Sequence, residues 1–467
     1  MSVSTPASIA SRATAAHLLN RIAFGPRPGD VERVATIGAK RYIDEQLAAD
    51  HPDPETDLAI RRNRSVGYSA SEIVLLHQRD GMSRSSVECT LDDLRTAKLQ
   101  RAVSAKNQLA EVMTDFWFNH FNVYIYSWEP SVPAYERESI RPHALGKFRD
   151  LLRAVAKSPA MMYYLDTFVS TANRTVDGKI VKGVNENYGR ELLELHTVGV
   201  TAGYEQHDVY EAARCFTGWD FGGWHAPVYG FRFASENHDR DAKSIFGLPL
   251  AAGGGEADGD RLIDYLSVHP KTAHFISWRL AQRFVADDPP PSLVEKCAGT
   301  FLRTEGDLRS VLTTLFTSDE FNDAAARRTK VKSPLEFAVS AIRALDGSVT
   351  DGKTLGKYLG DMGMPLYECK PPTGWSNRGT DWVNVSAQLY RFNLATSLAA
   401  GAVRGVTVTP RDASVAAVID DFGESVIGGA VGDSTRAAVM RIRQERDVPP
   451  AVKAMALLIA SPEFQYR

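Results

Sequence analysis

Residues 185–199, NENYGRELLELHTVG, hold the densest group of side chains that could do chemistry. On a helix, Glu191 and Glu194 are three residues apart and therefore share a face. His196 follows two residues later. Carboxylates with a nearby imidazole suit borderline metals such as iron, manganese, copper or zinc. This stretch therefore predicts a metal site.

The spacing does not match a known metal signature. Di-iron bundles use Glu-x-x-His and zincins use His-Glu-x-x-His, whereas here Glu194 stands where the histidine would be needed. His196 lies about 200° further around a regular helix, so only a helix end near Gly199 could bring it back. Glu186 and Arg190 are four residues apart on the helix and could pair. In the alternative interpretation, the Glu and Arg side chains form a solvated charged face and His196 only caps the helix.

A second candidate lies in residues 116–123, FWFNHFNV. The apolar residues before it recur at helical spacing, which predicts a long helix over residues 94–118. His120 then falls near the C-terminal end of this helix, where the dipole favours an imidazolium. Its aromatic neighbours predict that it is at least half buried. Such a histidine can be a metal ligand, a general base or a satisfied core residue.

Three further polar side chains could complete a site. Asp208 precedes an apolar helical stretch and is a plausible N-cap. Asp166 follows another apolar stretch and could cap the next segment or reach the site. His238 lies beside Asp239 in the glycine-rich residues 219–255. Charged loop residues are usually solvated, but loops on a rigid scaffold often supply site residues.

Helical periodicity dominates the chain and must position these residues. Two irregular stretches rich in glycine and aromatic residues interrupt it, at 219–255 and 367–384. We therefore expect a mainly α fold, a multi-helix globular domain with at most a short β-hairpin. The 467 residues are expected to form one large helical domain, 1–467, with possible sub-domains 1–218 and 256–467 flanking the first irregular stretch.

The composition excludes several classes of protein. The formal net charge is −3, from 54 Lys and Arg against 57 Asp and Glu, so no overall basic field exists to attract nucleic acid. No run of 18 apolar residues is present to span a membrane. The four cysteines form no CxxC pair, which favours free thiols in a reducing compartment. With no recognisable export signal, we expect a cytoplasmic protein, unless such a signal has been removed.

Known cofactor motifs give little support for nucleotide binding by this chain. Residues 347–354 match the phosphate-loop pattern GxxxxGK[ST] letter for letter. However, the preceding residues 334–345 read as a helix rather than the required strand, and Asp351 would place a negative charge beside the phosphates. We therefore interpret the match as a coincidence. Neither a GxSxG elbow nor a GxGxxG fingerprint is present, which argues against α/β-hydrolase and Rossmann chemistry.

Several stretches together resemble a large bacterial family known only as domain of unknown function 1800. The similarity runs from about His17 to the C-terminus. It is carried by 17–26 (HLLNRIAFGP), 116–123, 158–161 with Leu165 and Asp166, 185–197, 217–219 (TGW), His238 and Asp239 with Lys243, and 372–375 (PTGW). No settled activity comes with the family name. Many members look exported, whereas this chain shows no signal, and members look like partners of a second exported family similar to alkaline phosphatases and sulfatases.

The resemblance implies an enzyme-like helical domain with a set of polar motif residues. These are His120, Asp166, Asn185, Glu186, Asn187, Arg190, Glu191, Glu194, His196, Asp208, His238 and Asp239. A scaffold would not need so many costly groups beside apolar helices, so we expect a metal-dependent enzyme, an oxidoreductase.

The expected site combines these residues around one ion. The expected metal ligands are His120, Glu191, Glu194 and His196, and the expected catalytic residues are Glu191, Arg190, Asp208 and His238. Arg190 and Asn187 would orient the ligands. The metal, iron, manganese, copper or zinc, would activate dioxygen, peroxide or water on a small-molecule or peptide substrate. Aromatic residues of the irregular stretches would form the mouth and favour a substrate with apolar or ring character, namely Trp224, Tyr229, Trp375 and Trp382.

Two alternatives stay open. The first is a metal-dependent hydrolase, in which zinc or manganese lowers the pKa of a bound water. The second is a non-catalytic binding or assembly protein, in which a buried network of Glu, His and Arg side chains fixes the fold. The oligomeric state is not predicted.

Overall fold

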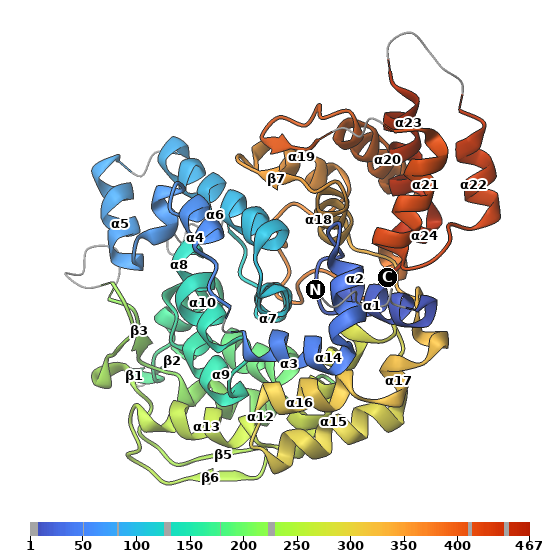
Figure 1. The fold of residues 1–467 in the computed structure, drawn as a ribbon. Coiled ribbons are helices and arrows are strands. Elements are labelled where there is room, and N and C mark those ends of the chain that lie inside the picture. The colour runs from blue at the N-terminus through green and yellow to red at the C-terminus, as the bar shows by residue number, and fades with distance from the viewer. Residues whose placement is uncertain are drawn as a thin grey trace.

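The computed structural model of the chain describes residues 8–49, 51–81, 84–125, 132–177, 179–222, 229–409, 413–442 and 448–467. Within these ranges helices predominate and strands are short, so the expected mainly α fold is confirmed. Figure 1 shows the C-terminal end of the chain beside α1, with the α20–α24 helices grouped on the same side. In the described ranges, no helix is both long and apolar enough to cross a membrane.

The helices follow one another with short connections. Those of the first half are α1 (Ile9–Arg21), α2 (Asp30–Ile37), α3 (Ala39–Ala48), α4 (Pro54–Ile60), α5 (Ala70–Arg79), α6 (Arg84–Ser104), α7 (Gln108–His120), α8 (Val132–Tyr135), α9 (Phe148–Ala156), α10 (Pro159–Tyr164), α11 (Asn187–Glu191) and α12 (Gln206–Cys215). Those of the second half are α13 (Ala257–Ser267), α14 (Pro270–Phe284), α15 (Pro291–Arg303), α16 (Leu308–Phe316), α17 (Asp319–Asn322), α18 (Pro334–Ala344), α19 (Lys353–Asp361), α20 (Val385–Ala399), α21 (Val415–Phe422), α22 (Asp433–Met440), α23 (Pro450–Ala460) and α24 (Pro462–Gln465).

Strands are more numerous than expected, because the described residues form four antiparallel pairs rather than at most one hairpin. The pairs are β1 (Arg174–Val176) with β2 (Lys179–Val181), β3 (Trp219–Asp220) with β4 (Arg232–Phe233), β5 (Lys243–Ile245) with β6 (Leu248–Leu250), and β7 (Ser348–Val349) with β8 (Val406–Thr407). Two of these pairs lie in the first irregular stretch. Trp224, expected at the mouth of the site, lies outside the described residues.

The single helix predicted over residues 94–118 is wrong, because the chain forms two helices, α6 and α7, in its place. The side-chain amide of Gln108 donates to the carbonyl oxygens of Ala102 and Ala105, at 3.1 and 2.8 Å, and so occupies acceptors that a continuing helix would use. The amide N–H of Lys106 is bound instead by the Asp53 carboxylate, at 2.9 Å. These partners come from distant residues, so helical periodicity could not reveal the break.

Helix α7 is fixed in the core by its apolar face. Leu109, Val112, Met113, Phe116 and Trp117 are at most 2% exposed and belong to one connected cluster of buried side chains. Truncating one such residue typically costs about 2–5 kcal/mol. The end of α7 therefore offers a rigid position for polar side chains.

The second irregular stretch is anchored to the end of α7, and its regular structure is one short helical turn, Gly379–Trp382. The Asn119 amide donates to the carbonyl oxygen of Trp375 at 2.8 Å, and the Trp375 N–H donates back to Asn119 at 2.6 Å. Asn122 donates to the carbonyl oxygen of Cys369 at 2.8 Å. These motif asparagines therefore connect α7 to the loop.

Candidate functional site

The motif of residues 185–199 forms helix α11 followed by a π-helical turn, Leu192–His196. The wider π turn accommodates an extra residue, and such turns occur frequently at functional sites. It buries Leu192, Leu193 and His196 while Glu191 and Glu194 stay half-buried on the outer face. The two carboxylates thus share a face, as the spacing predicts.

Arg190 is the centre of a polar cluster on this face. It pairs with Glu186 at 3.1 Å and with Glu194 at 3.4 Å, and it donates to the Gln206 side chain at 3.0 Å. Gln206 in turn donates to Glu186 at 2.7 Å. The three charged side chains are 27–37% exposed, so the cluster is open to water and to a ligand.

Glu191 differs from its neighbours because no hydrogen bond or ion pair within the described residues engages its carboxylate. Burial, and secondly the negative charge of Glu194, raise the pKa of Glu191 above its usual value, while Arg190 acts in the opposite direction. Glu194 is ion-paired with Arg190. The two carboxylates therefore sit in different environments: Glu194 has a cationic partner, whereas the environment of Glu191 favours its acid form.

Two tyrosine hydroxyls lie close to this carboxylate pair. Burial and the neighbouring Glu194 carboxylate raise the pKa of Tyr204 to about 12. Burial also raises the pKa of Tyr164, with a contribution from the charge of Glu191, and its hydroxyl donates to the carbonyl oxygen of Lys370 at 2.6 Å. Both hydroxyls stay protonated at neutral pH and can donate hydrogen bonds.

Asp166 and Asn187 join the same region. The Asn187 amide donates to the Asp166 carboxylate at 3.2 Å, which ties the residue after α10 to the start of α11. Asp166 has a φ of 58°, a left-handed conformation that is uncommon outside glycine. Sequence reasoning left Asp166 as either a cap or a site residue, and the Asn187 contact favours the second.

His120 and His196 lie together, but in the core. They are 2% and 1% exposed, their ring centroids are 6.3 Å apart, and the Phe121 ring contacts both. The Nε2 of His120 is 3.2 Å from the carbonyl oxygen of His196 and must donate, because a carbonyl only accepts. Burial lowers the pKa of His196 to about 3, and burial together with the charge of Arg279 lowers the pKa of His120. Both rings are therefore neutral.

The four predicted metal ligands thus divide into a buried imidazole pair and a half-buried carboxylate pair. In the part of the chain that the structure describes, no three His, Cys, Asp or Glu side chains lie close enough together to hold a metal ion. The donor set predicted from the sequence, His120, Glu191, Glu194 and His196, is therefore not assembled as a four-ligand metal centre by the described residues.

Asp208 and His238, the two other predicted catalytic residues, have structural partners. Asp208 accepts from the Glu205 N–H at 2.8 Å at the start of α12 and from the Phe246 N–H at 2.6 Å, so it caps the helix and holds the β5–β6 turn. His238 is 4% exposed and its Nε2 lies 3.2 Å from Asp258. Within the described part of the chain, neither side chain forms a hydrogen bond or ion pair with Glu191 or Glu194.

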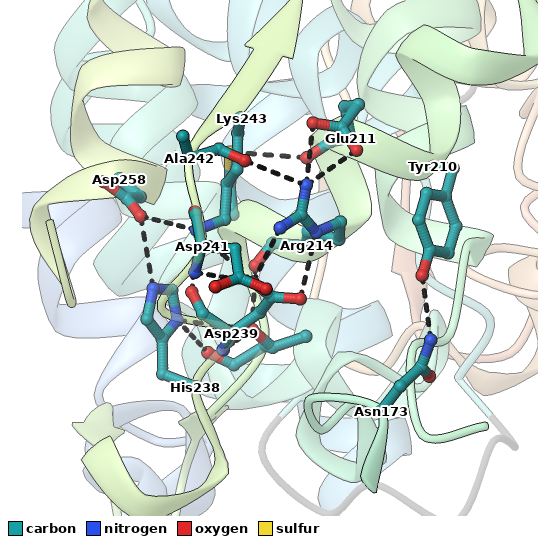
Figure 2. Close-up of polar contacts among 12 residues, drawn as sticks. Asn173, Tyr210, Glu211, Arg214, His238, Asp239, Asp241, Ala242, Lys243 and Asp258 are labelled. Carbon is teal, nitrogen blue, oxygen red and sulfur yellow. Dashed lines mark hydrogen bonds and ion pairs between the residues drawn. The ribbon is translucent and has the colours of Figure 1, made fainter. Parts of the chain in front are cut away.

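His238 belongs to a buried ionic network that joins the first irregular stretch to α12 and α13 (Figure 2). Lys243 pairs with Asp258 at 2.8 Å, and both side chains are fully buried. Nearby, Arg214 pairs with Glu211 at 2.7 Å and with Asp239 at 2.8 Å. We refer to these six residues as the His238 network.

Sequence reasoning missed Asp258 altogether. It stands in the first turn of α13 after three glycines, where an acidic residue ordinarily stabilises the helix dipole in solvent. Its burial depends on Lys243 and His238, which precede it by 15 and 20 residues. The local pattern around Asp258 therefore carries no signal of this role.

Gly189 allows α11 to approach α12 closely. We therefore expect that replacing it by alanine destabilises the fold. A Cβ there would lie 2.8 Å from the Ala213 nitrogen and 2.9 Å from the Val209 carbonyl oxygen, both backbone atoms that cannot move aside. Overpacking of this kind costs about 1–3 kcal/mol. Gly189→Ala should lower the midpoint of urea unfolding accordingly. Gly356→Ala, in α19 with open space around it, is the control and should raise stability by about 0.5–1 kcal/mol. Equal effects of the two substitutions would contradict the close approach.

Comparison with known protein families gives one match. A family model described as "Protein of unknown function (DUF1800)" matches residues 17–466, which is nearly the whole chain. Comparison with curated proteins finds no match, and comparison with solved structures finds none either. The resemblance seen in the motifs is confirmed, and the chain belongs to this family of proteins of unknown function.

Proposed function

We propose that the chain is an enzyme that uses general acid–base catalysis at the outer face of α11 and the π turn. The observation that carries the proposal is the asymmetry of the carboxylate pair. Glu191 is half-buried and unpaired within the described residues, and its pKa is raised, while Glu194 forms an ion pair with Arg190. Two carboxylates with diverging environments are the usual arrangement for an acid and a base that act together.

In this mechanism Glu191 donates a proton to a leaving group, and Glu194 accepts a proton or stabilises positive charge as it develops. Tyr204 would orient a polar substrate by donating a hydrogen bond, and Tyr164, whose proton is donated to the Lys370 carbonyl oxygen, would accept one. Asn187, bound to Asp166, lies at the start of the same helix and could complete the recognition of a small-molecule or peptide substrate. Hydrolysis of such a substrate fits these groups.

A metal-dependent enzyme, an oxidoreductase or a hydrolase, is the second candidate. It is favoured by Glu191 and Glu194 sharing one half-exposed face, since two carboxylates with water ligands suffice for a hard divalent cation. A titration with Mn²⁺, Mg²⁺ and Zn²⁺ distinguishes the two. A saturable rise in melting temperature that is lost in both Glu191→Gln and Glu194→Gln supports the metal, and no rise favours metal-free acid–base chemistry.

The charge asymmetry is tested by following the glutamate carboxyl signals by NMR over a pH titration, with Glu191 assigned by its absence in Glu191→Gln. Glu191 should titrate above its usual pKa. In Glu194→Gln its pKa should fall, because a neighbouring negative charge is removed, and in Arg190→Gln it should rise, because an opposing positive charge is removed. An ordinary pKa for Glu191, insensitive to both substitutions, would refute the proposal.

Measurements of catalytic activity test the role of Glu191 as the general acid. In a panel of model esters, glycosides and phosphate esters, Glu191→Gln should lower any activity about 100-fold, the lower range for loss of a general acid. Because the protonated form acts, the wild-type rate should fall as the pH rises through the pKa of Glu191. Glu295→Gln, an exposed glutamate on α15, is the matched control and should retain the activity. Equal rates in wild type and Glu191→Gln would contradict the assignment.

A further inference from the structure

A cavity lies where α1 meets the C-terminal residues, apart from the carboxylate pair. It has a volume of about 280 Å³, and its walls come from α1, from the segment before α18, from the π turn Gly423–Ile427 and from α24 with the residues after it. Figure 1 shows the C-terminal end beside α1, where these elements meet. The cavity is thus lined by the first helix, the C-terminal residues and two segments between them.

The walls of this cavity are strongly positive. Arg327, Arg328, Lys332 and Arg467 all line it, against one carboxylate, that of Glu463. The Thr435 hydroxyl donates one bifurcated hydrogen bond to the two oxygens of Glu463, at 2.8 and 2.9 Å, and Glu463 forms no ion pair among the described residues. Among the side chains that line the cavity, four cations thus face one carboxylate.

The cations have few partners of their own. Arg327 donates to the Thr14 hydroxyl at 3.1 Å and Arg328 to the carbonyl oxygen of Ile427 at 3.0 Å, which are neutral acceptors. Arg467 shares Glu336, at 3.1 Å, with Arg283. Its Nε atom is buried without a hydrogen-bond partner. Positive charge thus remains uncompensated within the described residues around the cavity.

Lys332 gives the clearest evidence for a bound anion. It lines the cavity and is 2% exposed. Its ammonium lies 3.7 Å from the centre of the Phe464 ring and forms no hydrogen bond or ion pair with another described residue. Burial lowers the pKa of Lys332 to about 7, and the nearby charges of Arg467, Arg391 and Arg328 oppose the attraction of Glu336. A buried ammonium that shares a distant carboxylate with several other cations is expensive, and an anion in the cavity would lower that cost.

We propose that this cavity binds a small molecule through an oxyanion, either a phosphate or a carboxylate group. Guanidinium groups bind both through paired hydrogen bonds, and an ammonium adds a point charge. The volume suits a small metabolite, because drug-sized ligands occupy about 300–1,000 Å³. Tyr466, which is 41% exposed at the cavity, offers an aromatic surface for the remainder of the molecule. This site is separate from the proposed acid–base site.

The test measures the binding of inorganic phosphate and of succinate by calorimetry, with the ionic strength held constant by sodium chloride. Saturable binding of either ion to the wild-type protein is expected, and the stronger of the two identifies the oxyanion. Lys332→Met should weaken it at least tenfold. Arg328→Gln, at a more exposed position, should weaken it several-fold and covers the case in which Lys332→Met does not fold.

Lys353→Gln is the matched control. Lys353 is an exposed lysine within the phosphate-loop pattern of residues 347–354, but there α18 precedes a two-residue antiparallel strand instead of a phosphate-binding loop. It should bind phosphate like the wild type. The proposal is overturned if neither ion binds saturably, if Lys353→Gln loses as much affinity as Lys332→Met, or if both cavity variants bind as tightly as the wild type.

Discussion

Replacing Asp258 by asparagine is expected to lower the free energy of unfolding by about 3 kcal/mol. Asp258 is the counter-charge for Lys243, at 2.8 Å, with both side chains fully excluded from solvent (Figure 2). Removing one partner of a buried pair typically costs about 3–5 kcal/mol, because the remaining charge is left in a poorly solvating environment. We expect the lower end of that range, because Lys243 also donates to the carbonyl oxygens of Asp239 and Asp241, at 2.7 and 3.0 Å.

The second oxygen of Asp258 adds to the cost. Lys243 and His238 both contact the same oxygen, Oδ2, at 2.8 and 3.2 Å. Oδ1 is buried without a hydrogen-bond partner among the described residues. An asparagine that keeps its carbonyl oxygen at the Oδ2 position therefore loses the negative charge and also buries its amide N–H groups without an acceptor.

Chemical unfolding at pH 7 measures the effect, with two comparisons. Asp264→Asn, on the same helix α13, breaks a half-exposed pair with Arg153 and should cost less than about 1 kcal/mol. The double variant Lys243→Met with Asp258→Asn removes both charges and should be more stable than Asp258→Asn alone. If Asp258→Asn lowered the free energy of unfolding no more than Asp264→Asn does, the His238 network would not hold the first irregular stretch against α12 and α13.

Local sequence patterns predicted the elements of the candidate site, but not how deeply each side chain is buried. The three-residue spacing of Glu191 and Glu194 correctly predicted a shared face, and the Arg190–Glu186 pair was anticipated from its spacing of four. The π turn was not, because periodicity is read at 3.6 residues per turn and an inserted residue leaves no clear mark. That turn buries His196 with His120 and separates both from the carboxylates.

Long-range contacts explain the remaining differences. Gln108 ends α6 with its side chain, and no glycine or proline marks the break. Lys332 and Arg467 read as ordinary surface cations, since Lys and Arg are rarely fully buried unless paired. Their burial in one cavity depends on α1, α24 and the segment before α18 meeting in space. Such a meeting is not encoded in any short window of sequence.

Glu336→Gln is expected to have the other large effect, a loss of about 3–5 kcal/mol at pH 7. Glu336 is 7% exposed at the start of α18 and binds Arg283 at 2.5 Å and Arg467 at 3.1 Å. Its other oxygen accepts from the Ser333 N–H at 2.8 Å, which a glutamine oxygen can also do, but the glutamine amide group would then face the two guanidiniums as a second donor. Asp44→Asn, in an exposed pair with Lys40, is the control and should change stability by less than about 0.5 kcal/mol.

The pH dependence identifies the mechanism. Burial alone would raise the pKa of Glu336, but Arg283 and Arg467 lower it to about 2. A carboxylate whose pKa is lower in the folded state stabilises fully above the unfolded value, near 4.5, and the contribution disappears as the pH falls toward 2. The difference between wild type and Glu336→Gln should therefore be constant near neutrality and shrink from about pH 4.5 downward. A difference that did not change with pH would mean that Glu336 acts by packing rather than by charge.

Glu336 also links the stability of the fold to the proposed oxyanion cavity. In the wild type, Arg467 forms an ion pair with Glu336 and also lines the cavity. Without the carboxylate, more of that positive charge is available to a bound anion, so phosphate should stabilise Glu336→Gln more than it stabilises the wild type. Equal stabilisation of the two proteins by phosphate would show that Arg467 does not face the ligand, and the anion would then be held by Lys332, Arg327 and Arg328 alone.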